Sequence, residues 1–169
     1  MKLTKQFTVN ASADCLWEIM GTQFADISNW ASGVYASQGH YNGAKLQGAP
    51  YSGRICETSI GTLKEQILIY DDQNKTVSYD AKSAQLPFFV THMVNTWTFT
   101  PLAKGQCKGE MNLEISLLPL FSLIMGPIMK MRVGGAIAQT IEELTHVAEH
   151  EEIHPRKLES QQKLQPKST

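Results

Sequence analysis

The chain has 169 residues, of which 42% are apolar and 18% are charged, a composition that suits one compact globular domain. The formal net charge of −1 gives no field that would gather phosphates, which argues against nucleic acid as a partner. The three cysteines are too widely spaced for a disulfide framework or a zinc knuckle, and the amino terminus lacks the apolar core of a secretory signal. We therefore expect a cytoplasmic protein with reduced thiols.

The beginning of the chain predicts a strand and two short helices. Residues 3–9 alternate apolar and polar side chains, as a short strand does. Ser12 is a favourable N-cap for a helix over residues 12–20, which Gly21 then ends. Apolar residues at three-residue steps predict a second short helix over residues 22–30.

Residues 33–118 show a period of two with turn signals between the segments, which predicts an antiparallel meander. One face of each strand is apolar and the other is polar, so another layer must cover the apolar face. Ser78 and His92 are expected on the polar face, and His40 is expected at a strand end, in a loop. The residues expected on the apolar face include Leu63, Ile67, Ile69, Val77, Tyr79, Ala81, Met93, Trp97, Phe99, Met111, Leu113, Ile115 and Leu117.

A helix over residues 120–149 is the predicted element long enough to cover that face. Gly126 and Pro127 predict that the helix kinks or restarts there. The apolar run over residues 117–129 is shorter than the roughly 20 residues that span a bilayer, so it could at most lie in a membrane surface. The polar composition that follows predicts one domain over residues 1–151 and a flexible tail over residues 152–169.

Three stretches of the sequence carry a family resemblance. The stretch "ASADCLWEIMGTQFADISNWASGV" resembles the opening helices of the SRPBCC or START-like superfamily, particularly its polyketide cyclase/dehydrase and lipid transport branch. The stretches "GRICETSIGTLKEQILIYDDQNKTVSYDA" and "NTWTFTPLAKGQCKGEMNLEISL" are similar to that branch's central hairpin and last two strands.

This resemblance covers roughly residues 1–150 and implies an α+β helix-grip fold. In that fold a curved antiparallel sheet of about seven strands, in the order β-α-α-β6-α, wraps on a long carboxy-terminal helix. The resemblance also implies an apolar cavity between sheet and helix that admits a hydrophobic small molecule.

Inward-facing side chains of the sheet and of the last helix are the candidates for contact with such a ligand. The apolar ones could equally fill a solid core, and the methionines suit either role because thioether side chains adapt to irregular space. The candidate ligand-binding residues are Glu65, Ile67, Tyr79, Met93, Asn95, Trp97, Met111, Leu113, Phe121, Met125, Met129, Val133 and Ile137.

Glu65, Tyr79 and Asn95 are polar groups expected on the apolar face. A buried carboxylate must be paired or protonated, so Glu65 either faces a ligand or is satisfied near a strand end by water or by Arg54. For Arg54 we expect an ordinary surface ion pair, with contact to a ligand carboxylate as the alternative. If the protein is an enzyme, Glu65 would be its acid or base, and Tyr79 or Asn95 would polarise a carbonyl.

The sequence contains no phosphate-binding or nucleophile motif. His146, His150 and His154 recur every four residues, a spacing that could bind a transition metal on a continuous helix. However, no cysteine accompanies them, and Pro155 indicates that the helix is ending. We interpret them as a solvated helix face and expect neither a metal nor a cofactor.

Three functions are open at this point. We prefer binding and sequestration or transport of a lipid-like or aromatic metabolite, because the sequence shows no arrangement of acid, base and nucleophile. The alternatives are a polyketide cyclase/dehydratase-like enzyme and a peripheral membrane lipid-transfer protein. In the latter, residues 117–129, edged by Lys130 and Arg132, would contact the bilayer transiently. We expect a monomer or a weak homodimer.

Overall fold

The computed structural model describes residues 1–164, apart from the side chains of Ser122, Ile124 and Leu164. Its elements in chain order are β1 (Lys2–Val9), α1 (Ala13–Trp17), η1 (Glu18–Thr22), η2 (Phe24–Asn29), β2 (Val34–His40), β3 (Gly53–Thr58), β4 (Gly61–Asp71), β5 (Thr76–Lys82), β6 (Val90–Ala103), β7 (Gln106–Leu117), α2 (Pro119–His150) and α3 (Pro155–Leu164).

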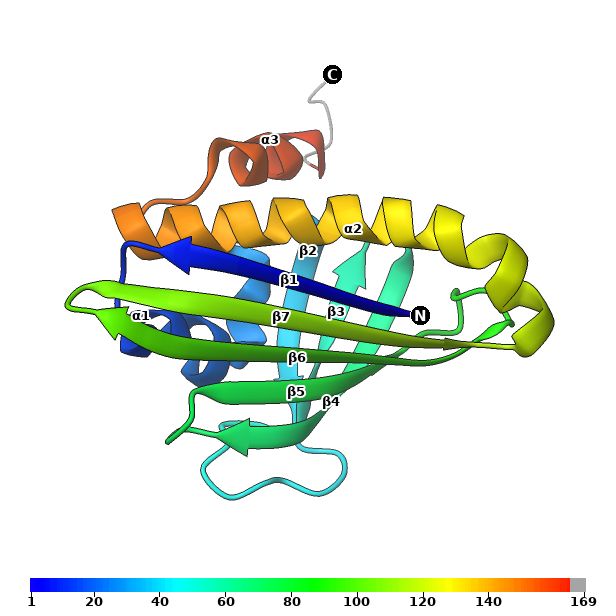
Figure 1. The fold of residues 1–169 in the computed structure, drawn as a ribbon, viewed down its shortest axis with the longest axis horizontal. Helices are drawn as coiled ribbons and strands as arrows, with labels where there is room; N and C mark the ends of the chain where they lie inside the picture. The colour runs from blue at the N-terminus through cyan, green and yellow to red at the C-terminus, as the bar shows by residue number, and fades with distance from the viewer. Residues whose placement is uncertain (165–169) are drawn as a thin grey trace.

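The seven strands form one antiparallel sheet in the order β1-β7-β6-β5-β4-β3-β2. The sheet is curved, and the long helix α2 runs beside β1 along its length (Figure 1). Helix α1 lies near the end of the sheet where β6 turns into β7, and η2 packs against β2 and β3 (Figure 1). The expected α+β architecture, a curved sheet gripping a long helix near the carboxy terminus, is confirmed.

Most of the predicted apolar face is confirmed. On β5, for example, Val77, Tyr79 and Ala81 are at most 4% exposed. The prediction for Ile69 is wrong, because its side chain is 48% exposed. A bulge in β4 places Ile67 opposite Tyr79 but Ile69 opposite Ser78, and one inserted residue reverses which face the following side chains occupy.

Ser78 differs from its expected solvated position. It is only 2% exposed, because neighbouring side chains enclose it. Its hydroxyl donates to the Asn95 carbonyl oxygen at 3.1 Å and lies 2.9 Å from the Thr96 hydroxyl. Because these two partners satisfy the hydroxyl, it does not need water, and a polar residue on this face can be buried.

The two expected short helices are less regular than the sequence indicates. The first consists of α1 and a π-helical turn, η1, and the second is the 3-10 helix η2. Their aromatic residues Trp17, Phe24 and Trp30 are at most 5% exposed and belong to the core. Gly21 is required beside Trp17, because a Cβ at residue 21 would lie 2.7 Å from the indole ring.

Helix α2 is continuous from Pro119 to His150 with Pro127 inside it, and it bends early in its course (Figure 1). The bend agrees with the expected kink, since proline removes a helical hydrogen bond and its ring displaces the preceding turn. Within the described residues, no helix has the length and apolar character needed to cross a membrane.

The flexible tail expected from residue 152 is wrong for residues 155–164, which form helix α3 and dock on the domain. Lys157 is 1% exposed, and its ammonium group donates to the Val34 carbonyl oxygen at 2.7 Å. Arg156 donates to Glu142 at 2.7 Å and to the buried Glu143 at 3.0 Å. Polar side chains that find buried partners can dock a helix whose composition alone indicates a solvated tail. Residues 165–169 lie outside the described part of the chain.

Candidate ligand-binding site

The structure divides the thirteen candidate ligand-binding residues into two groups. Seven are fully enclosed by the core and its polar network: Glu65, Ile67, Tyr79, Trp97, Met111, Leu113 and Ile137. Six are only half-buried, although they lie on the inner side of the sheet or on α2: Met93, Asn95, Phe121, Met125, Met129 and Val133.

Arg54 and Glu65 form a buried ion pair within the enclosed group. The Arg54 Nε donates to Glu65 Oε2, and the two side chains are 2% and 7% exposed. The guanidinium also donates to the Phe24 carbonyl oxygen at 2.6 Å and lies 4.1 Å from the Phe24 ring centroid. The surface ion pair expected for Arg54 is therefore wrong, because η2 and its Phe24 cover the guanidinium.

The pair alters the ionisation of its neighbours. Burial alone would lower the pKa of the Arg54 guanidinium, but the Glu65 carboxylate raises that pKa above its ordinary value. Burial, reinforced by Glu65, raises the pKa of the Tyr79 hydroxyl, which accepts a hydrogen bond from the Trp97 indole at 3.3 Å. Arg54 is therefore a permanent cation here, and Tyr79 stays neutral.

His40 supports the same strands and lies at a strand end as expected, but it belongs to the strand and not to the loop that follows. It is the last residue of β2, is 7% exposed, and its Nε2 lies 3.1 Å from the Glu65 carbonyl oxygen. A Cβ at Gly53 would lie 1.9 Å from that carbonyl oxygen and 2.7 Å from His40 Nε2. Only glycine at residue 53 permits this close approach of β2, β3 and β4.

The half-buried group forms an apolar margin between the sheet and the first half of α2. From the sheet it contains Met93, and from α2 it contains Met129 and Val133, all of which pack against the edge of the core. Leu117 at the end of β7 also belongs to this margin. Because these side chains face inward without complete burial, the contact of α2 with the sheet is looser here than around the fully buried Leu144.

Asn95 places one unsatisfied polar atom beside this margin. Its Oδ1 is buried and accepts no hydrogen bond from the described residues, although most buried acceptors in proteins have a partner. In the sheet, Asn95 lies between Tyr79 on β5 and Leu113 on β7. A carbonyl oxygen in this position could accept a hydrogen bond from a hydroxyl or N–H group of a bound molecule.

An aromatic cluster that the sequence prediction did not include lies at the start of α2. Phe121 stacks on Phe89 with ring centroids 4.9 Å apart and a 7° angle between planes. Phe88 meets the Phe121 ring edge-on at 5.2 Å. The adjacent Phe88 and Phe89 between β5 and β6 could have predicted such a contact from the sequence, because aromatic side chains in a loop usually pack against another apolar element. The cluster joins the loop between β5 and β6 to the start of α2.

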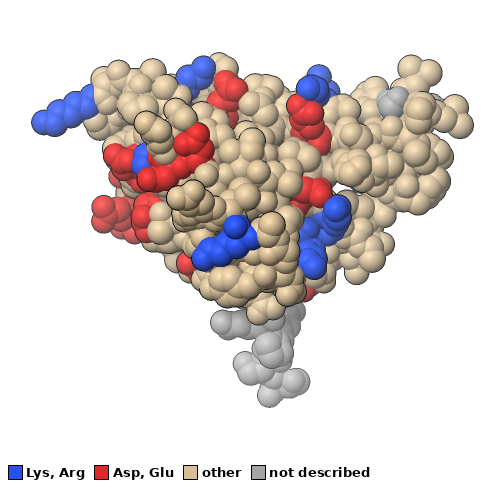
Figure 2. Space-filling view, turned by 90° about the horizontal axis from the view of Figure 1, so that it is seen from below, with Lys and Arg blue, Asp and Glu red and all other residues tan. Residues whose placement is uncertain are grey.

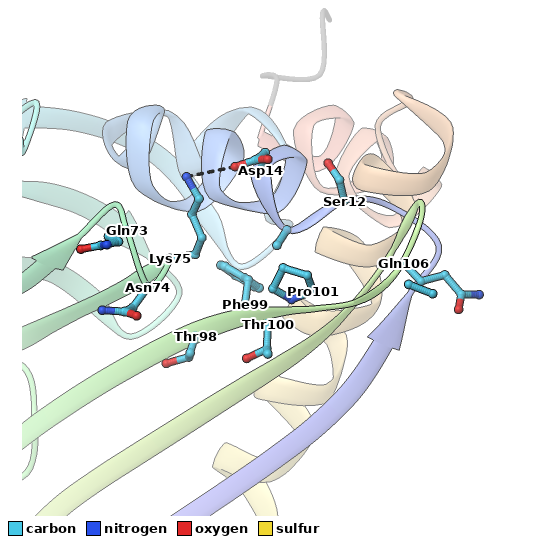
Figure 3. Close-up of a pocket in the computed structure, with 12 residues that line it drawn as sticks. Ser12, Asp14, Gln73, Asn74, Lys75, Thr98, Phe99, Thr100, Pro101 and Gln106 are labelled. Atoms are coloured by element: carbon cyan, nitrogen blue, oxygen red, sulfur yellow. Dashed lines mark ion pairs between the residues drawn. The ribbon is translucent and has the colours of Figure 1, made fainter.

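A surface hollow of about 410 Å³ lies at the opposite end of the sheet (Figure 3). Its lining includes Ser12 and Asp14 at the start of α1, Asn74 and Lys75 at the β4–β5 turn, and Gln106. An ion pair of 3.0 Å between Lys75 and Asp14 crosses part of it (Figure 3). None of the thirteen candidate residues lines this hollow, and its lining mixes polar side chains with apolar ones such as Phe99 and Pro101.

The three carboxy-terminal histidines are close together but do not share one helix. The His146 ring lies 4.8 Å from that of His150 and 5.0 Å from that of His154. Helix α2 ends at His150, and Glu151 has the left-handed φ of 58° that turns the chain away. Among residues 1–164 with described side chains, no group of His, Cys, Asp or Glu has the arrangement of a metal site.

The curved sheet, the gripping helix and the inward apolar margin define a START-like helix-grip protein. The family model described as polyketide cyclase/dehydrase and lipid transport matches residues 1–149. The chain therefore belongs to the polyketide cyclase/dehydrase and lipid transport family. No curated protein sequence matches it.

Solved structures show the same fold at low sequence identity. A START superfamily protein from Mycobacterium smegmatis is 15% identical with a TM-score of 0.68, over 87% of this chain and 96% of that one. The protein XoxI from Bacillus cereus is 15% identical with a TM-score of 0.68, over 90% and 99%. A norcoclaurine synthase from Thalictrum flavum, solved with a transition state analogue, is 19% identical with a TM-score of 0.62, over 86% and 93%.

Proposed function

We propose that the protein binds a hydrophobic small molecule between the inner face of the sheet and the first half of α2. The ligand is lipid-like or aromatic and carries at least one hydrogen-bond donor. Its apolar part lies against Met93, Leu117, Met129 and Val133, and its donor reaches Asn95. The protein then sequesters or transports this molecule without changing it.

The observation that carries this proposal is the unpartnered Asn95 Oδ1 beside half-buried apolar side chains. Leaving a buried amide oxygen without a hydrogen bond costs about 1–3 kcal/mol, so a site that keeps one gains affinity for a donor. Each ligand methylene removed from water adds about 0.8 kcal/mol. One fixed polar contact within an apolar surround is the usual composition of a small-molecule site. The family description, which includes lipid transport, supports the same class of ligand.

The enzyme alternative receives less support from the geometry. Glu65 already pairs with Arg54, and Tyr79 already accepts a hydrogen bond from Trp97. A general acid or base must reach the substrate, whereas the Glu65 side chain is 7% exposed and lies beneath η2. We therefore propose that Glu65 has a structural role. The cytoplasmic location expected from the sequence stays a prediction.

Two methionines on α2 give a matched test. Met129 is half-buried at the proposed site, whereas Met131, two residues further on, is 73% exposed. The probe is N-phenyl-1-naphthylamine, an uncharged aromatic amine with an N–H donor, whose fluorescence rises when it leaves water. We expect Met129→Lys to weaken its binding by at least about ten-fold, because the ammonium group enters the apolar site. Met131→Lys should change binding by less than about two-fold.

Equal affinities in both variants, or no binding by the wild type, would contradict the proposed site. Thermal unfolding of each variant, followed by circular dichroism, confirms that it is folded before titration. Native mass spectrometry of freshly purified wild-type protein should also detect a bound small molecule that Met129→Lys loses.

A further inference from the structure

Helix α2 is apolar on two faces over its first half, and only one of them turns toward the domain. The other face carries an apolar row at helical intervals on the outside of the helix. We refer to this row as the outer stripe; it consists of Leu120, Leu123, Pro127, Ile128 and Met131. Leu120, Leu123 and Met131 are 74%, 83% and 73% exposed. An apolar row of this length facing water marks a binding surface on most soluble proteins.

Exposed apolar side chains continue beyond the outer stripe onto neighbouring segments. Phe88, between β5 and β6, is 76% exposed, and Leu118, just before α2, is 39% exposed. Phe88 contacts Phe121 of α2, so the loop and the start of the helix form one continuous end of the molecule. In Figure 2 the right-hand end, where α2 begins in Figure 1, shows no charged side chain at its extremity.

Cations without carboxylate partners border this apolar end. Lys130 and Arg132 lie on α2, and Lys5 lies on the edge strand β1. None of the three forms a salt bridge with any residue of the described chain. Between Glu114 and Glu142 the sequence contains no acidic residue. The positive charge here is therefore not neutralised locally, although the whole chain has a net charge of −1.

Two of these cations share a groove with the outer stripe. An open hollow of about 480 Å³ between β1 and α2 is lined by Leu3, Lys5, Pro127, Lys130, Met131 and Gly134. The apolar side chains of this hollow can contact the acyl chains of a phospholipid. Its two ammonium groups can contact the phosphate of the same lipid. A partner with both chemistries in one plane fits this surface.

We propose that the outer stripe and its bordering cations form a docking surface for an anionic phospholipid bilayer. The apolar side chains enter the boundary between headgroups and acyl chains, and Lys5, Lys130 and Arg132 contact lipid phosphates. The helix lies in the plane of the interface, as amphipathic helices with basic edges do. This surface goes beyond the proposed ligand site, because its side chains point away from the margin that faces the sheet.

Vesicle flotation tests this surface. The probes are vesicles of phosphatidylcholine alone and vesicles in which about one third of the lipid is phosphatidylserine. We expect the wild type to float with the anionic vesicles, to bind neutral ones at least about ten-fold more weakly, and to dissociate at about 0.5 M salt. The double variant Leu123→Ser/Met131→Ser should lose at least about ten-fold in vesicle binding. These residues are exposed, so the domain stays folded.

The matched control is Ile60→Ser/Leu68→Ser, which removes two exposed apolar side chains at the β3–β4 turn and on β4. It should bind vesicles like the wild type. A second variant, Lys130→Glu/Arg132→Glu, should abolish the preference for anionic vesicles. The proposal is overturned if the wild type does not float, if the control loses binding equally, or if the stripe instead joins two copies. That last result would be a wild-type dimer in sedimentation that Leu123→Ser/Met131→Ser converts to a monomer.

Vesicle binding is measured without the small-molecule probe, so the two proposals fail separately. Met129→Lys should reduce binding of the naphthylamine probe while leaving the outer stripe in place. Loss of vesicle flotation with intact probe binding would remove the docking surface alone.

Discussion

Arg54 and Glu65 are direct cross-strand partners on β3 and β4, and their side chains meet inside the protein under Phe24. Two opposite charges in the interior stabilise the fold only while both are present, because each compensates the other for the loss of water. The pair therefore connects the β3–β4 hairpin to η2, through the hydrogen bond from Arg54 to the Phe24 carbonyl oxygen.

Replacing Glu65 tests whether this carboxylate is structural or catalytic. Glu65→Gln leaves the Arg54 charge buried without its partner, so the free energy of unfolding should fall by about 3–5 kcal/mol. Urea unfolding followed by circular dichroism measures the change. The exposed Glu57→Gln on β3 is the control and should change stability by less than about 0.5 kcal/mol. The double variant Arg54→Met/Glu65→Leu should recover most of the loss, and a fully stable Glu65→Gln would contradict the structural role.

In the absence of ligand, replacing Asn95 should raise the stability of the protein, whereas replacing Glu65 should lower it. Asn95→Leu removes an unsatisfied buried acceptor, so the free energy of unfolding should rise by about 1 kcal/mol. The same variant should bind N-phenyl-1-naphthylamine about three- to ten-fold more weakly, because the N–H donor of the probe loses its acceptor.

Asn112→Leu on β7 is the matched control for Asn95. The Asn112 amide accepts from Thr4 at 2.6 Å and donates to Glu110 at 2.9 Å, so the same substitution there should lower stability. Opposite signs in urea unfolding are the expected result. If Asn95→Leu destabilises the protein as much as Asn112→Leu, the Asn95 oxygen is satisfied in solution and cannot be the ligand contact.

The sequence pattern was sufficient to predict the layers of this fold and most of the residues that face inward. Alternation placed Tyr79 and Met111 correctly, because side chains of a regular strand alternate faces whatever the surroundings. It was wrong for Ile69, since a bulge adds one residue without a sequence sign of its own. The pairing of Glu65 with Arg54, which was one of the alternatives expected for Glu65, follows from the tight turn that pairs Thr58 with Gly61, because counting away from this turn brings the two residues opposite each other.

Local sequence patterns could not predict which side chains are buried by segments distant in the sequence. Nothing near Arg54 in the sequence shows that η2 covers it, and only the tertiary structure places Phe24 on its guanidinium. The same holds for Lys157, whose neighbours are polar but whose ammonium group meets the carbonyl oxygen of Val34 from β2. The candidate site shares this limit, because an unsatisfied oxygen such as that of Asn95 is defined by what surrounds it.

Alkaline pH should weaken the fold through its buried thiols. Burial raises the pKa of the Cys56 thiol from its ordinary value near 9 to about 12, even though Arg54 acts in the opposite direction. Burial likewise raises the pKa of Cys107 to about 11. In both cases the folded protein favours the neutral thiol, so this contribution to stability is complete below pH 9 and is lost as the pH rises toward the folded-state values.

The free energy of unfolding should fall by about 1.4 kcal/mol per pH unit for each such thiol between its unfolded-state and folded-state pKa. Urea unfolding at a series of pH values between about 8 and 11 measures it. Cys56→Ala removes one titrating thiol, so its stability should fall less steeply with pH than that of the wild type, whatever its stability at neutral pH. Parallel curves for the two proteins would show that Cys56 ionises as readily in the folded chain as in the unfolded one.

Glu143, which is 1% exposed on α2, is one of the residues that contact α3. Its carboxylate accepts from the Ser32 backbone N–H at 2.9 Å and from Arg156 of α3 at 3.0 Å. Glu143→Ala removes the acceptor that α2 offers to both segments, so α3 should detach and the free energy of unfolding should fall by about 2 kcal/mol.

Hydrogen exchange measured by mass spectrometry reports on this detachment directly. In Glu143→Ala, amide exchange in residues 155–164 should become at least about ten-fold faster than in the wild type, while the central strands change little. Glu159→Ala, an exposed position on α3, is the control and should leave exchange unchanged. Unaltered protection of α3 in Glu143→Ala would mean that the contacts of Arg156 with Glu142 and of Lys157 with Val34 are sufficient to hold the helix, and that the Glu143 carboxylate is not needed for docking.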